Sequence, residues 1–169
     1  MAIRYILEKG DPQLEKKSRP VTEFNKRLHT LLDDMRETLK RANGYGLAAP
    51  QVGVLRRAVI VLDPSDNTKT IDEQIIELIN PVIEETRGEQ VGPEGCLSVP
   101  GIYGIVKRPQ YAVVRAQDRN GNAITVSGEG ITARCLCHET DHLDGRLFTE
   151  IVERILSDEE LEKFVSEED

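Results

Sequence analysis

The sequence of 169 residues has no tryptophan, only three cysteines, and no apolar run near the ~20 residues of a membrane-spanning helix. Its first residues, Met1-Ala2-Ile3-Arg4-Tyr5, lack the basic and then apolar layout of a secretory signal peptide. We therefore expect a cytoplasmic protein that does not bind membranes. Three cysteines are too few for a disulfide framework, and in a reducing compartment they predict metal ligands or core residues.

Positive charge is also scarce, since 22 lysines and arginines face 30 acidic residues and the net charge is −8. A broad basic face for DNA is therefore not expected. The length suits one catalytic domain over residues 1–169 with one core. Residues 150–169 hold nine acids and form a short acidic tail, in which Ser157 and Glu160 are spaced as the capping box of a terminal helix.

Apolar periodicity predicts two long helices with short strands between them. An amphipathic helix should follow Thr22 as its N-cap, continue to Arg41, and end at Asn43 and Gly44. Strands are predicted at 57–62, 75–80, 82–85, 102–106, 111–117 and 123–129, with Pro81 separating two of them and 89–95 as a loop. Asn120-Gly121 favours a hairpin. This pattern predicts an α+β fold in which mixed short antiparallel strands pack around a central metal-binding helix.

The central helix carries His138-Glu139-Thr140-Asp141-His142, preceded by Gly130 and followed by Gly145 as a stop. Side chains four residues apart lie on one helix face, so the two imidazoles can bind one metal ion. A glutamate beside the first histidine can act as a general base. Histidines that only pack or face water are the alternative, but two of the three histidines standing at ligand spacing favour the metal. The third, His29, should lie at the surface.

A catalytic metal site needs a third protein ligand, and no histidine follows His142. The remaining candidates are two carboxylates in the tail and three thiols: Glu160, Glu162, Cys96, Cys135 and Cys137. The carboxylates are more simply explained as solvent-exposed charges. Cys135 shares a helix face with His138, which crowds the geometry, whereas Cys96 beside Gly95 can approach from a distant loop. A small buried hydrophobe is the other interpretation of Cys96.

A low-bulk segment, Gly44-Tyr45-Gly46-Leu47-Ala48-Ala49-Pro50-Gln51, follows the first helix. Its two glycines allow another backbone to approach closely. No lysine-serine pair follows, so it is not a phosphate-binding P-loop. The alternative is a plain turn between helix and strand. Gln51 at its end has an amide that can donate a hydrogen bond into a cleft.

Three motifs in order resemble the peptide deformylase family: the segment from Gly44 to Gln51, Glu94-Gly95-Cys96-Leu97-Ser98, and the five-residue helix motif. The resemblance covers most of the chain, to about Phe148. It implies the following roles: Cys96, His138 and His142 hold the metal, Glu139 is the acid and base, Gln51 and the backbone N–H of Leu97 form the oxyanion hole, and Tyr45-Gly46 pairs with an extended substrate.

The resemblance implies a metal-dependent hydrolase that removes the N-formyl group from the N-terminal methionine of newly made polypeptides and releases formate. One divalent ion is implied, Fe²⁺ by expectation, with Zn²⁺, Ni²⁺ or Co²⁺ able to replace it. Partners are N-formylmethionyl nascent peptides; the resemblance allows a transient ribosome association, although the tail is not basic. Three residues depart from the family pattern: Arg134, where an apolar residue often lines the methionine pocket, Cys137 and Thr140. A zinc peptidase and a structural metal site in a binding module are the rival interpretations.

Overall fold

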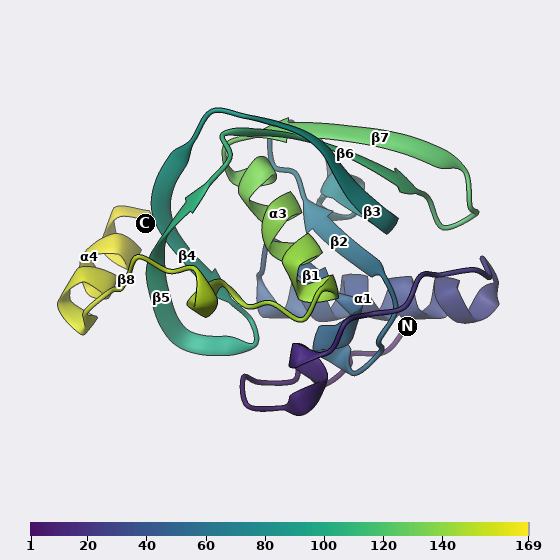
Figure 1. Ribbon diagram of the computed structural model, residues 1–169, viewed down its shortest axis with the longest axis horizontal. Coiled ribbons are helices and arrows are strands. Elements are labelled where there is room, and N and C mark those ends of the chain that lie inside the picture. The colour runs from purple at the N-terminus through teal and green to yellow at the C-terminus, as the bar shows by residue number, and fades with distance from the viewer. Residues whose placement is uncertain (169) are drawn as a thin grey trace.

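Short strands and two long helices make up the chain, whose computed structural model describes residues 1–168, with side chains to 164 (Figure 1). The strands are β1 (Gly46–Ala48), β2 (Ala58–Leu62), β3 (Ile75–Arg87), β4 (Gln90–Cys96), β5 (Val99–Arg108), β6 (Tyr111–Gln117), β7 (Ala123–Glu129) and β8 (Arg154–Ile155). The helices are α1 (Lys26–Ala42), α2 (Ile71–Gln74), α3 (Ile131–Leu143) and α4 (Asp158–Glu168), with 3-10 turns η1 (Pro12–Glu15), η2 (Ala49–Val52) and η3 (Phe148–Glu150).

Two antiparallel sheets surround α3, which runs through the middle of the molecule in Figure 1. One sheet has the strand order β1-β2-β3-β6-β7, and the other has the order β4-β5-β8. Contacts join α3 to β2 of the first sheet and to β5 of the second. The predicted α+β class with a central helix is therefore confirmed.

Both faces of β2 are buried, which explains the continuous apolar run of this strand. Ala58 and Ile60 lie in the core cluster formed with α1, whereas Val59 and Val61 lie in the cluster formed with α3. Successive side chains of a strand point to opposite faces, so one strand serves both cores. Helix α1 thus backs the sheet on the side opposite the histidine helix.

The start of α1 differs from the prediction. Asn25, not Thr22, is the N-cap, and its side-chain oxygen accepts a hydrogen bond from the Leu28 N–H at 3.2 Å. Asparagine caps a helix as well as threonine does, and Asn25 lies closer to Leu28, the first buried position of the helix. The predicted end is confirmed, because Asn43 adopts the left-handed conformation with φ 54°.

Two strand predictions were wrong. β3 continues through Pro81, because a register shift between Ile79 and Val82 leaves the proline outside regular pairing. Of the predicted loop 89–95, residues 90–95 belong to β4, which pairs with β5 along its length. The hairpin at Asn120-Gly121 and the bounds of β7 are confirmed.

The C-terminal part ends in the predicted capped helix. Ser157 Oγ accepts from the Glu160 N–H at 3.2 Å, and the Ser157 N–H donates to the Glu160 carboxylate at 3.3 Å. Within residues 1–168, none of the helices has the length and apolar character needed to cross a membrane.

Candidate metal centre

Three potential metal ligands come together from two elements. α3 places His138 and His142 one turn apart, and β4 ends at Cys96. The Cys96 Sγ lies 3.3 Å from His142 Nε2, which lies 3.3 Å from His138 Nε2. All three ligand atoms lie within 4.8 Å of one another. The structure thus brings the thiol, which is distant in sequence, to the two imidazoles that share one turn of α3.

The other candidate ligands lie elsewhere. Glu160 bonds to Arg154 and caps α4. Cys135 and Cys137 are buried in the core between α3 and the five-stranded sheet. Burial raises the pKa of the Cys137 thiol to about 11, although the Arg108 charge opposes the rise. Both helix thiols are therefore small hydrophobic core residues.

A buried carboxylate orients the first histidine. Glu94 Oε2 lies 2.7 Å from His138 Nδ1, so a proton on Nδ1 bonds to Glu94 and leaves the Nε2 lone pair facing Cys96 and His142. Arg108 Nη2 donates to the same oxygen at 2.7 Å. Burial alone would raise the pKa of Glu94, but His138 and Arg108 hold it well below its usual range.

Sequence reasoning gave Glu94 no role, although its place two residues before Cys96 was a signal. Arg134 also differs from the expectation that it stands in for an apolar pocket residue. Its Nη1 donates to Glu94 Oε1 at 2.9 Å and its Nη2 to the Val106 carbonyl at 3.2 Å. The guanidinium is thus engaged with the buried carboxylate that holds His138.

Glu139 lies beside the ligand set with one free oxygen. Its side chain is buried, and Oε1 has no hydrogen-bond partner among residues 1–164. Burial raises the pKa of Glu139 to about 7; the His138 charge opposes this and Glu94 adds to it. A Cβ built on Gly46 would lie 2.5 Å from Glu139 Oε2, so β1 contacts the carboxylate closely. A carboxylate with a pKa near 7 can both accept and release a proton at neutral pH.

Gln51 projects from η2 toward the thiol. Its Oε1 accepts from the Ala48 N–H at 2.9 Å, and its Nε2 donates to Ser98 Oγ at 3.0 Å. Nε2 also lies 3.6 Å from Cys96 Sγ. Because the oxygen is already bonded to the backbone, the amide nitrogen faces the site. Ser98, which sequence reasoning did not single out, holds it there.

Leu97 and the low-bulk segment lie against one another. A Cβ built on Gly44 would come within 2.9 Å of the Leu97 side chain. Tyr45 is half exposed, and its carbonyl accepts from the Leu62 N–H of β2 at 2.7 Å. Backbone groups of successive residues point in opposite directions across a strand, so those of Gly46 point away from β2. β1 is a sheet edge there.

The donor set suits a first-row transition metal. One sulfur and two imidazole nitrogens favour such an ion over magnesium or calcium, which prefer oxygen ligands. Three protein ligands also leave one position of a tetrahedral ion open, as in catalytic sites.

Comparisons with known proteins find relatives of this chain in both sequence and structure. The family model of polypeptide deformylase matches residues 3–157. A peptide deformylase of Caldanaerobacter subterraneus subsp. tengcongensis is 54% identical over 96% of this chain and 97% of its own length. A solved peptide deformylase from Legionella pneumophila has a TM-score of 0.82 and 40% identity, covering 99% of this chain and 98% of its own. The peptide deformylase of class I type b from Acinetobacter baumannii, solved with Met-Ala-Ser bound, has a TM-score of 0.81 and 31% identity. The match covers 89% of this chain and 99% of that one.

The fold and the site define a metal-dependent amide hydrolase. The chain belongs to the peptide deformylase family. Enzymes of this family remove the N-formyl group from nascent peptides, and this chain is an enzyme of that class.

Proposed function

We propose that Cys96, His138 and His142 hold one divalent ion, Fe²⁺ in the cell, and that Zn²⁺, Ni²⁺ or Co²⁺ can take its place. The observation that carries the proposal is the convergence of these three ligand atoms within 4.8 Å, beside a buried carboxylate with a free oxygen. When bound, the ion supplies Lewis-acid activation of water and of the formyl oxygen. Glu94 fixes the ring of His138 for this task.

Glu139 moves the proton in this proposal. Its Oε1 takes a proton from the attacking water and then delivers it to the leaving amine, so that formate and a free N-terminus result. A pKa raised by burial to about 7 suits both steps near neutral pH. The carboxylate has no competing hydrogen bond at Oε1 in the described part of the chain.

Gln51 Nε2 and the backbone N–H of Leu97 form the oxyanion hole. Support comes from the position of Nε2 beside Cys96, fixed by the hydrogen bonds of Gln51 to Ala48 and Ser98. Donors held in place before reaction stabilise the developing negative charge, and removal of one typically costs about 10²–10³ in rate.

The proposed substrates are nascent peptides that begin with N-formylmethionine. An extended peptide can add to the free edge of β1, where Gly46 offers its outward N–H and C=O while Tyr45 flanks the entrance. The Met-Ala-Ser peptide bound to the A. baumannii relative has the sequence expected of a product. The absence of a Cβ on Gly46 lets the substrate backbone and Glu139 approach the same point.

We further propose that residues 1–169 form one catalytic domain, since α3 contacts both sheets. The reaction takes place in the cytoplasm, where three free thiols stay reduced. Any association with the ribosome is transient and does not use residues 150–169 as a basic docking element, because this tail is acidic.

The role of Glu139 is tested by Glu139→Gln. The variant should keep its metal and lose deformylation of formyl-Met-Ala-Ser by about 10³-fold, because the amide cannot accept the water proton. The matched control is Glu129→Gln, an exposed glutamate of β7. Activity within tenfold of the wild type would assign the base elsewhere. Cleavage of a blocked internal peptide by the wild type would instead favour the rival zinc peptidase.

The ligand set is tested by Cys96→Ser, with Cys137→Ser as the matched control. Metal content per chain after anaerobic purification should fall sharply in Cys96→Ser, because the thiolate ligand is lost. Cys137→Ser should keep its metal, because this thiol lies in the core. Full occupancy with unchanged affinity in Cys96→Ser would contradict the assignment.

A further inference from the structure

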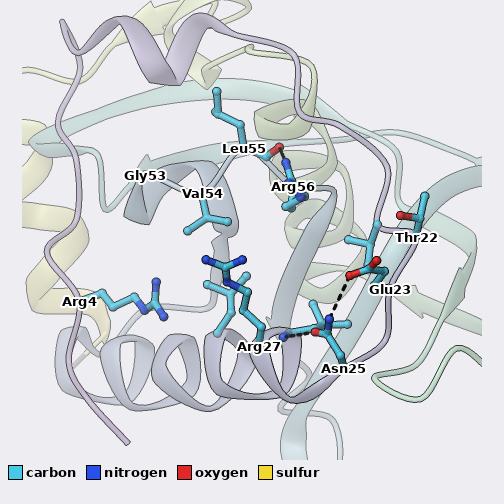
Figure 2. A pocket seen from close by; sticks show the side chains of 12 residues that line it. Arg4, Thr22, Glu23, Asn25, Arg27, Gly53, Val54, Leu55 and Arg56 are labelled. Atoms are coloured by element: carbon cyan, nitrogen blue, oxygen red, sulfur yellow. Dashed lines mark hydrogen bonds between the residues drawn. The ribbon is translucent and has the colours of Figure 1, made fainter.

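A second pocket shares no lining residue with the metal centre and has a volume of about 800 Å³ (Figure 2). Its walls come from the N-terminal segment at Arg4, the turn at 21–25, the first turns of α1, and the connection from η2 to β2. Ligand pockets for small molecules typically have about 300–1,000 Å³. The volume therefore suits a small organic molecule.

Three arginines line this pocket. Figure 2 shows Arg4 on one side, Arg27 rising from α1, and Arg56 on the wall above it. Arg4 is paired with Asp34 at 2.9 Å. Among residues 1–164, Arg27 has neither an ion pair nor a side-chain hydrogen bond, and the guanidinium of Arg56 donates only to the Leu55 carbonyl at 3.4 Å. Two guanidinium groups thus remain available to an anion in a chain whose net charge is −8.

The start of α1 adds to the positive potential of the pocket. Asn25 and Leu28 belong to the lining, and the first turn of the helix contains no acidic residue. The first N–H groups of a helix carry a partial positive charge, which favours anions, although the Leu28 N–H already donates to Asn25 Oδ1. Among the residues whose side chains are described, Glu23 is the one acid of the lining, and its carboxylate accepts from the Asn25 amide at 3.2 Å. The positive groups outnumber this single acid.

Part of the lining is apolar. Leu28 and Leu31 of α1 and Val54 of the connection from η2 to β2 supply this apolar part, and Val54 packs against the core cluster that contains both leucines. Guanidinium groups recognise carboxylate and phosphate by paired hydrogen bonds, and aliphatic walls bind the body of a ligand by excluding water. We propose that this pocket binds a small amphipathic anion, namely a carboxylate or phosphate monoester with a short aliphatic chain. This site is independent of the proposed function of the metal centre.

The test uses the zinc-loaded full chain, labelled with ¹⁵N, and follows amide chemical shifts during titration. The probes are hexyl phosphate and hexanoate, with inorganic phosphate and hexanol as the head group and the tail alone. At least one of the two amphipathic anions should move the amides of Leu28, Gly53 and Val54 saturably, with a Kd below ~1 mM. Inorganic phosphate and hexanol should each bind at least about tenfold more weakly. The probe that binds more tightly then shows whether the pocket prefers a phosphate or a carboxylate group.

The variant pair locates the binding. Arg27→Gln with Arg56→Gln should weaken binding by about tenfold or more, because two charge-assisted contacts are lost. Arg41→Gln with Arg146→Gln is the matched control, since both side chains are exposed and lie outside the lining. Deformylase activity without probe should be unchanged in both variants and reports correct folding. The proposal is overturned if the probes do not saturate by ~10 mM, if hexanol binds as tightly as the anions, or if both double variants behave alike.

Discussion

At the scale of single residues, Glu94 determines whether the first histidine can serve as a ligand. The Glu94 carboxylate accepts hydrogen bonds from His138, Arg108 and Arg134. Glu94→Gln keeps the shape of this side chain but replaces the anionic acceptor by a neutral amide. The ring of His138 then loses its fixed orientation. Outer partners of a ligand typically contribute 10–100-fold to metal affinity. We expect zinc affinity to fall by about that factor in a competition with a chromophoric chelator.

The control for this prediction is Glu129→Gln, and the melting temperature of the metal-free protein separates folding from binding. A purely structural role for Glu94 would lower the melting temperature of the metal-free chain and leave zinc affinity unchanged. That result would contradict a positioning role.

The histidine pair could be predicted because both residues lie within one turn of one helix. The choice of Cys96 over Cys135 could not be made from spacing alone, since it depends on the approach of β4 to α3. Glu94 was missed for a related reason: a carboxylate in a segment read as a loop is expected to face water. Only the fold shows that its charge is buried against two arginines.

At the scale of elements, the close packing of β1 on α3 makes Gly46 indispensable. In Gly46→Ala the new Cβ would fall 2.5 Å from Glu139 Oε2 and displace the carboxylate. A displacement of about 1 Å in an active site can cost about 10²-fold in rate. We expect kcat/KM for formyl-Met-Ala-Ser to fall by about this factor while the metal stays bound.

The matched control is Gly92→Ala in β4. A Cβ at this position would come no closer than 3.6 Å to Arg134 Nη2, which is an ordinary contact. Equal losses of activity in both variants would show that replacing any strand glycine lowers kcat/KM, and that the contact with Glu139 is not the cause.

Element predictions succeeded where local chemistry decides and failed where pairing decides. Asn43 and the Asn120-Gly121 turn act through their own backbone preferences, so both were predicted correctly. β4 contains Gly92, Pro93 and Gly95, which disfavour strands, but its pairing with β5 outweighs this local preference. The sequence carries no local signal for such a partner.

At the scale of the whole molecule, Glu77 of β3 joins distant parts of the chain. Its carboxylate accepts from Arg36 of α1 at 2.7 Å and from Arg119 of the β6–β7 turn at 2.7 Å. Burial alone would raise the pKa of Glu77, but the hydrogen bonds of Arg119 and Arg36 hold it below its usual value of 4.5. The folded state therefore keeps this group charged to a lower pH than the unfolded chain does.

This depressed pKa has a defined effect on stability. The contribution of Glu77 to the free energy of unfolding is complete above about pH 4.5 and is lost as the pH falls through the lower folded pKa. Urea unfolding should show Glu77→Gln about 2 kcal/mol less stable than the wild type at pH 7, with a smaller difference at acidic pH. The control Glu84→Gln replaces a half-exposed carboxylate and should change little. If the loss of stability in Glu77→Gln became larger as the pH fell, the lowered pKa of Glu77 in the folded state would be contradicted.

The α+β class and the central helix were predictable because apolar periodicity reports burial. The strand order β1-β2-β3-β6-β7 could not be predicted, since the sequence of a strand does not indicate which other strand pairs with it. The double burial of β2 offered a hint, because a strand that is apolar at every position must have a covered face on both sides.

The burial of Cys135 and Cys137 makes the protein convenient for chemical labelling. Both side chains are nearly inaccessible, at 8% and 5% exposure, whereas Cys96 is partly accessible. Once a chelator has removed the metal, a maleimide dye should attach at one position, Cys96 of the proposed metal centre. The extent of labelling would report how much of the protein lacks its metal, without any engineered cysteine or removal of a native one.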